Sequence, residues 1–344
     1  MRLSFPQITT RALMLIVAVA ALGVYGLSPA LRPRPAFLQS PHGYLHAIAL
    51  SFDEKWLVTG GLEEPSSHQT IGVVSLLDLA TGQARWEYQV AGTDKRIETF
   101  RISTDGQMVI GQSAHSLRFL NISNGKLVRS LRGLSGQTGC QTMSADASLA
   151  AWATEAGINL QEVASGKAMG TLDAPLSFVL EFSPDAKLLA SASGWRVQRP
   201  QPDDVTLWDI ASGKPAATLN GPPGGISCLA FAPDGKTLAA GGREDGATLL
   251  WDVASGRLIA RLQPHASSTK AIVFSPDSKT LASVSSGGSA SDDITCWDVS
   301  SFKKRAHTST GKELMSFCLL FDRAGTTLFA GCEDGTVLVH DTAP

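Results

Sequence analysis

The chain has 344 residues, more than one ordinary compact core holds, which predicts two or three domains or one repetitive architecture. Hydrophobic residues make up 43% and charged residues 17%, a composition that excludes a disordered chain. Lys and Arg total 29 against 31 Asp and Glu, for a net charge of −2, so we expect no nucleic-acid partner.

The first thirty residues read as a targeting segment. Arg2 and Arg11 precede an uncharged apolar run over residues 12–27, and Ser28-Pro29-Ala30 offers small residues for cleavage. The run is longer than the apolar part of most signal peptides and slightly shorter than the roughly 20 residues that span a bilayer. Both an uncleaved membrane-anchoring helix and a cleaved signal peptide therefore stay open. Either one predicts a membrane-anchored or secreted chain, with residues after a linker at 31–36 on the extracytoplasmic side.

Internal repeats organise the rest of the chain. The segments TLWDIASGK at 206–214 and TLLWDVASGR at 248–257 have weaker copies upstream and downstream. Seven copies place an acid or amide at one position, with spacings of 41 to 47 residues: Asp78, Asn121, Glu162, Asp209, Asp252, Asp298 and Asp341. A second signature, such as FAPDGK ending at Lys236, precedes each of the first six, and the seventh copy, FDRAGT at 321–326, is degenerate.

Each repeat predicts a four-stranded antiparallel unit. In the fifth repeat, apolar residues alternate through Leu229, Phe231, Leu238 and Ala240 on both sides of a Pro-Asp-Gly turn, which gives two strands. The third strand ends at Trp-Asp, and the fourth runs over residues 257–262.

These motifs resemble the WD-repeat β-propeller family over residues 37–341. The resemblance implies an all-β, seven-bladed propeller of four-stranded antiparallel blades over residues 37–344. The alternative is six closed blades and a loose hairpin.

Closure of the ring is predicted to use the N-terminal end of the propeller. Only three residues follow Asp341, too few for a fourth strand. The segment Phe37-Leu38-Gln39 resembles Arg261-Leu262-Gln263 in the fourth strand of the fifth repeat. We therefore expect residues 35–40 to form the outer strand of the last blade and to cover an edge that would otherwise invite association.

In the WD family a His, a Ser or Thr, an Asp and the Trp of a blade form a buried hydrogen-bonded tetrad. The sixth repeat comes nearest to it, and the resemblance implies a structural tetrad of His265, Ser283, Asp292 and Trp297, with Asp293 as the alternative to Asp292. We interpret the set as structural, although it contains the residue types of a Ser-His-Asp triad. Other repeats have lost members, since Leu77, Leu120 and Gln161 replace Trp in the first three.

No motif of nucleophilic, phosphate-binding or metal-dependent catalysis is found, so we expect no catalytic residues, cofactor or metal. The five cysteines form no CxxC pair and are interpreted as buried small hydrophobic residues.

Long connections between second and third strands supply the candidate partner-binding rim. The longest, over residues 193–204, contains an aromatic residue beside basic ones, a combination that favours binding hot spots. Trp195 could equally fold back onto its own blade. The candidate rim residues are Trp195, Arg196, Arg199, Arg243, Glu244, Glu63, Glu64 and His68.

The leading functional hypothesis is a non-catalytic scaffold, exported or anchored, that binds a protein or peptide through this rim and contacts the membrane through its N-terminal helix. The alternative is a propeller enzyme or ligand-binding protein that uses polar groups, with or without a metal, at the mouth of the central channel. A convergent cluster of Asp, Glu and His at that mouth would favour the alternative.

Overall fold

The computed structural model describes residues 37–40, 43–63, 70–90, 95–103, 105–113, 115–132, 140–192, 204–263, 268–285, 293–310, 314–332 and 334–342. The predicted targeting segment and its linker lie outside these residues. Over the described ranges every regular element is a β-strand, and no helix there is long and apolar enough to cross a membrane.

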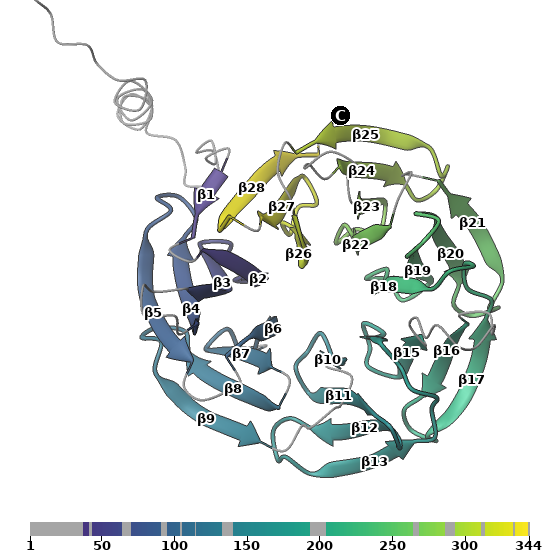
Figure 1. Ribbon diagram of the computed structural model, residues 1–344, viewed down its shortest axis with the longest axis horizontal. Coiled ribbons are helices and arrows are strands. Elements are labelled where there is room, and N and C mark those ends of the chain that lie inside the picture. The colour runs from purple at the N-terminus through teal and green to yellow at the C-terminus, as the bar shows by residue number, and fades with distance from the viewer. Residues whose placement is uncertain are drawn as a thin grey trace, which may run out of the picture. The chain divides into compact units, whose positions relative to one another are not determined.

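The strands form seven four-stranded antiparallel sheets arranged as the blades of a ring (Figure 1). Blades one to three contain β2 (Tyr44–Leu50), β3 (Trp56–Glu63), β4 (Ile71–Asp78), β5 (Ala84–Val90); β6 (Ile97–Ile102), β7 (Met108–Ser113), β8 (Ser116–Asn121), β9 (Leu127–Arg132); and β10 (Gln141–Met143), β11 (Leu149–Thr154), β12 (Gly157–Glu162), β13 (Ala168–Leu172). Blades four and five contain β14 (Val179–Phe182), β15 (Leu188–Ala192), β16 (Val205–Asp209), β17 (Lys214–Leu219); and β18 (Ile226–Phe231), β19 (Thr237–Gly242), β20 (Thr248–Asp252), β21 (Leu258–Leu262). Blade six contains β22 (Thr269–Phe274), β23 (Thr280–Ser285), β24 (Asp293–Asp298) and β25 (Lys304–Ser309). Seven blades are therefore present, and not the six of the alternative prediction.

Blade seven draws its strands from both ends of the described chain. It consists of β26 (Leu314–Phe321), β27 (Thr327–Cys332), β28 (Thr336–Asp341) and β1 (Phe37–Gln39). Strand β1 pairs antiparallel with β28, with Leu38 opposite Val337 and Gln39 opposite Thr336. Figure 1 shows this purple strand against the yellow one, where the sequence predicts the closing strand.

The turn between the first and second strands explains why each repeat folds into a tight hairpin. In blade six the Ser275 hydroxyl donates to the Asp277 carboxylate at 2.6 Å and accepts from the backbone N–H of Thr280 at 2.9 Å. Ser278, between them, has a φ of +60°, in the left-handed region that such a turn requires. In blade seven, whose signature is degenerate, the Asp322 carboxylate accepts from the backbone N–H of Thr327 at 2.9 Å instead.

The hydrophobic core is divided among the junctions between adjacent blades. At the closing junction Leu38, Phe329 and Val337 of blade seven pack with Leu45 and Leu57 of blade one. Every other pair of neighbouring blades shares a cluster of the same kind, so each blade depends on both of its neighbours.

Candidate functional site

One face of the ring carries the connections between second and third strands and those between successive blades; we call it the loop face. Of the eight predicted rim residues, the structure describes three: Glu63, Arg243 and Glu244. The other five, Trp195, Arg196, Arg199, Glu64 and His68, lie outside the described residues.

The turn of blade five presents Arg243 and Glu244 on a fixed backbone. The N–H of Arg243 donates to the carbonyl of Gly225 at 2.9 Å. Glu244 lies directly over Gly224, where an added Cβ would fall 2.6 Å from the Glu244 Cβ. Both charged side chains are exposed. The turn therefore offers a cation and an anion whose backbone is already ordered.

Asp245 fixes the other side of the same turn. Its carboxylate accepts from Arg261 Nη2 at 2.7 Å and from the backbone N–H of Ala247 at 3.0 Å. The side-chain amide of Gln263 donates to the Asp245 carbonyl at 2.7 Å. These bonds tie the turn to the outer strand β21, so little conformational entropy remains to be lost when a partner binds.

Glu63 does not join this group. It ends β3 opposite Ile71 in blade one and is half-buried. Blades one and five stand on opposite sides of the ring (Figure 1), so a contact spanning both would need a partner that crosses the channel.

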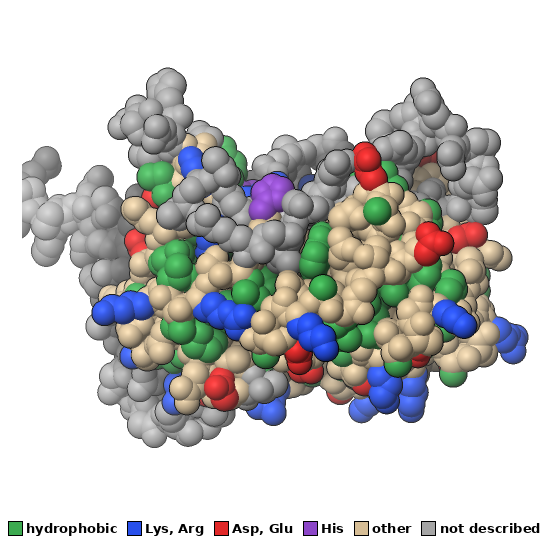
Figure 2. All heavy atoms as spheres, turned by 90° about the horizontal axis from the view of Figure 1, so that it is seen from below, with side chains coloured by type: hydrophobic (Ala, Val, Ile, Leu, Met, Phe, Trp, Pro, Cys, Tyr) green, Lys and Arg blue, Asp and Glu red, His purple; other side chains and the backbone are tan. Residues whose placement is uncertain are grey.

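The surface of the described residues is of mixed sign. Figure 2 shows Lys and Arg side chains interspersed with Asp, Glu and neutral groups on the face in view. Such a surface suits polar contacts with a protein better than a continuous contact with phosphates.

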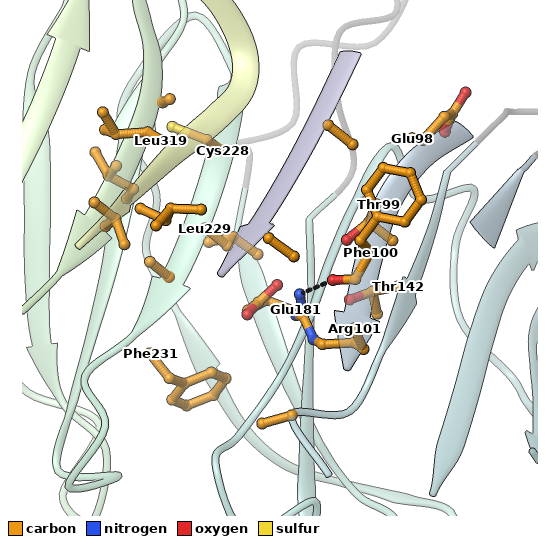
Figure 3. A pocket seen from close by; sticks show the side chains of 18 of the residues that line it. Glu98, Thr99, Phe100, Arg101, Thr142, Glu181, Cys228, Leu229, Phe231 and Leu319 are labelled. Carbon is orange, nitrogen blue, oxygen red and sulfur yellow. Dashed lines mark hydrogen bonds between the residues drawn. The ribbon is translucent and has the colours of Figure 1, made fainter. Parts of the chain in front are cut away.

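A second candidate site is the central channel, which has a volume of about 610 Å³ and is lined by the innermost strands of all seven blades. Three polar residues of consecutive blades, Arg101, Thr142 and Glu181, line one side of it. Figure 3 shows Arg101 and Glu181 pointing toward one another, with Leu229, Leu319 and Phe231 on the opposite side. Sequence reasoning missed this group.

Two carboxylates in the channel differ in their surroundings. Glu98 accepts a hydrogen bond from Gln141 Nε2 at 3.3 Å. Burial raises the pKa of Glu181 to about 7, against the opposing effect of the positive charge of Arg101. The Arg101 guanidinium donates through Nη1 to the carbonyl of Phe100 at 3.1 Å, which holds it at the wall.

Three adjacent stretches, residues 213–252, 256–298 and 298–341, match the family model described as WD domain, G-beta repeat. They run from the outer strand of blade four to the end of blade seven, inside a complete seven-bladed ring. The chain is a WD-repeat propeller. No curated protein matches it. Propellers of WD repeats are generally protein-interaction scaffolds and are usually non-catalytic.

In the WD repeat of blade six, two of the four predicted tetrad residues meet. Trp297 Nε1 donates to the Ser283 hydroxyl at 3.3 Å, and Ser283 is fully buried. His265 and Asp292 lie outside the described residues. The alternative acid, Asp293, is described and lies 4.0 Å from His307 Nε2 on the adjacent outer strand.

Blade four contains the same pair, which sequence reasoning missed. Trp208 Nε1 donates to the Ser191 hydroxyl at 2.9 Å. The signal was present, because LASAS at 189–193 matches LASVS at 281–285 and places Ser191 at the position of Ser283. The pair links the second and third strands of its blade, which is a structural role.

The described cysteines and acids give no support to catalysis by a thiolate or a metal. Cys140, Cys228, Cys296 and Cys332 are buried, and burial raises the pKa values of Cys228 and Cys296 to about 11. Within the described part of the chain, no group of three or more His, Cys, Asp or Glu side chains could hold a metal.

His46 is the one described histidine buried without a hydrogen-bond partner. It is the extra residue of a bulge in β2, where the pairing shifts between Leu45 and Ala47. Neither ring nitrogen finds a partner among the described residues, and burial together with the positive charge of Arg96 lowers its pKa to about 4. His46 is therefore neutral near pH 7.

Proposed function

We propose that this WD-repeat propeller is a non-catalytic scaffold that holds a protein or peptide partner against its loop face. The observation that carries the proposal is the ordered turn of blade five. Arg243 and Glu244 are exposed there; the backbone of Arg243 is bonded to Gly225, and Asp245 bonds to Ala247 on the other side of the turn. Preordered polar groups at the edge of a rigid ring cost little to immobilise, which favours recognition of a partner over turnover of a substrate.

We further propose that the partner presents charges of both signs next to blades four and five. Trp195, Arg196 and Arg199 belong to the connection of blade four, which is next to blade five in the ring. An aromatic anchor flanked by Arg is the combination that most often dominates binding energy at protein interfaces.

The propeller is proposed to lie on the extracytoplasmic side of a membrane, either anchored or secreted. The support is the apolar segment over residues 12–27 behind Arg2 and Arg11. A mass measurement of the mature N-terminus separates the two forms. An amine reagent that cannot cross membranes, applied to cells with an intact cytoplasmic membrane, should label the exposed Lys126. Labelling that requires lysis contradicts this location.

The loop-face proposal is tested by crosslinking in intact cells, followed by capture of the tagged chain. The variants are Trp195→Ala, Arg196→Ala, Arg243→Ala and the charge reversal Glu244→Lys. The reversal should reduce capture most, because it places like charges opposite one another.

The matched control is Arg257→Ala, which removes an exposed Arg at the turn before β21, on the face opposite the loop face. Capture should fall several-fold in the four rim variants and stay unchanged in the control. Equal capture by all five proteins, or an equal loss in the control, contradicts the proposed surface.

A further inference from the structure

The side chains of the channel wall lie in levels because the inner strands of the blades pair in the same register. In each blade, the second-to-last residue of the innermost strand pairs with the third residue of the second strand. Arg101 lies opposite Ile110, Glu181 opposite Ala190, and Val273 opposite Ala282. Seven residues share this level, and all of them line the channel: Ala49, Arg101, Thr142, Glu181, Ala230, Val273 and Leu320.

This level is divided into two halves. Blades two, three and four contribute Arg101, Thr142 and Glu181, whereas the remaining four blades contribute only aliphatic side chains. The channel is therefore amphipathic across its width: a cation, a hydroxyl and a carboxylate face an apolar wall (Figure 3). A repeat protein that needed the channel only for packing would have no reason to place opposite charges on one side of one level.

Contacts within the described residues leave hydrogen-bonding capacity at both Arg101 and Glu181. Among the described residues, the Arg101 guanidinium donates one hydrogen bond, from Nη1 to the carbonyl of Phe100, and a guanidinium has five N–H donors. The Glu181 carboxylate accepts no hydrogen bond from a described residue, and the two side chains form no direct ion pair within the described chain although they point toward one another. A carboxylate desolvated in this way gains from any donor that a ligand brings.

The chemistry of a fitting ligand follows from these two groups. An anion alone would satisfy Arg101 but lie beside the Glu181 carboxylate, and a cation alone would lie beside the guanidinium. A molecule with a carboxylate and an ammonium satisfies both without adding net charge to the channel, where each contact is stronger than in water. The aliphatic half of the level would take an apolar side chain.

We propose that the channel binds a zwitterion with an α-amino acid headgroup and an aliphatic side chain, either a free amino acid or a dipeptide. Its carboxylate pairs with Arg101, its ammonium pairs with Glu181, and its side chain contacts Val273 and Leu320. Thr142, between the two charged residues, supplies a hydroxyl to the same headgroup.

Exposed aromatic residues border the channel lining at both ends of the inner strands. Phe178, before the start of β14, and Phe52, after the end of β2, both line the channel and are 37% and 53% exposed. They belong to opposite ends of inner strands, so each mouth has an apolar border over which an aliphatic side chain can pass.

Isothermal titration calorimetry of the purified full chain tests the proposal with five probes: L-leucine, the dipeptide leucyl-alanine, glycine, 4-methylpentanoate and 3-methylbutylamine. We expect leucine or leucyl-alanine to bind at least tenfold more tightly than each of the other three probes. The tighter of the two zwitterions identifies which one the site accepts.

Arg101→Gln and Glu181→Gln should each weaken the binding of the preferred zwitterion at least tenfold. The matched controls Arg257→Gln and Glu87→Gln remove the same charges at exposed positions outside the channel and should leave binding unchanged. Glu181→Gln keeps the shape of the native side chain and Arg101→Gln shortens it while keeping a polar end, and thermal unfolding of each variant shows whether the ring is intact. An intact variant that binds as the native protein does overturns the proposal.

Two further results overturn it as well. If no probe binds the native chain, the channel is not a zwitterion site. If 4-methylpentanoate or 3-methylbutylamine binds as tightly as leucine and leucyl-alanine, the site recognises a single charge.

Discussion

Gln39 makes in blade seven the contact that Gln263 makes in blade five: each side-chain amide donates to the carbonyl of an Asp in the turn between second and third strands. Gln39 Nε2 lies 3.4 Å from the Asp334 carbonyl, and Gln263 Nε2 lies 2.7 Å from the Asp245 carbonyl. The N-terminal strand thus occupies the place of a fourth strand in its side-chain contacts as well as in its backbone pairing.

Leu38→Ala tests this closure. Leu38 is 2% exposed and packs with residues of blades seven and one, so its truncation leaves a cavity at the closing junction. We expect the free energy of unfolding, measured in urea, to fall by about 2–5 kcal/mol. Leu258→Ala is the control, because Leu258 on the outer strand β21 is 52% exposed and should change stability by less than about 0.5 kcal/mol. Similar values for the two variants would show that closure contributes little.

Ser283→Ala and Ser191→Ala test the Trp–Ser pairs. Each substitution leaves a buried indole N–H without its acceptor and should cost about 1–3 kcal/mol of unfolding free energy. A double-mutant cycle of Ser283→Ala with Trp297→Phe isolates the hydrogen bond, and we expect a coupling energy of about 0.5 kcal/mol or more. A coupling of zero would mean that the single-variant losses come from packing alone.

Glu181→Gln tests the desolvated carboxylate. The pKa of Glu181 is about 7 in the folded protein, against 4.5 for an unperturbed glutamate, so between these pH values the folded state holds a proton that the unfolded chain has released. The contribution of Glu181 to stability therefore falls as the pH rises from 4.5 to 7, by a total on the order of 3 kcal/mol. The variant should lack this fall when urea unfolding is measured across the range, and Glu87→Gln should keep it. A variant with the native pH profile contradicts the raised pKa.

His46→Leu tests a group with the opposite pH dependence. The pKa of His46 is about 4 in the folded protein and 6.5 when unperturbed, so the unfolded chain takes up a proton first as the pH falls. Native stability should decrease from pH 6.5 toward pH 4 relative to the variant, again by a total on the order of 3 kcal/mol. The exposed His115 provides the control variant His115→Gln, which should follow the native profile. Parallel profiles for the native protein and His46→Leu would rule out burial of a neutral histidine.

The blades could be predicted because the information that forms them is local and repeated. A turn signature that contains an Asp, an acid or amide at the end of the third strand, and a spacing of 41 to 47 residues recur even in repeats that have lost the tryptophan. Closure was also predictable, since Phe37-Leu38-Gln39 carries the residues of a fourth strand. The family model matches only the last three repeats, whereas Leu77, Leu120 and Gln161 stand in place of Trp in the first three. The fold of those blades depends on strand alternation more than on the signature.

The channel group could not be recognised from any one repeat. Arg101 and Glu181 are 80 positions apart in the printed sequence, and each alone looks like a charged residue on a strand. They become neighbours only when seven inner strands are brought to a common register around one axis. Aligning the repeats at the residue before the first turn would have shown three consecutive polar residues in an otherwise aliphatic column. The pKa of Glu181 depends on desolvation by the ring and could not have been derived in that way.

The pairing of β1 with β28 also bears on how the chain is made. The ribosome synthesises Leu38 among the first residues of the propeller, but its partner Val337 is among the last. Until then the facing surfaces of blades one and seven stay uncovered, and a nascent chain must be kept from aggregating for nearly the whole of translation. Translation that stops before Thr336 should accordingly yield an aggregation-prone fragment that is open to proteolysis, and not a smaller ring.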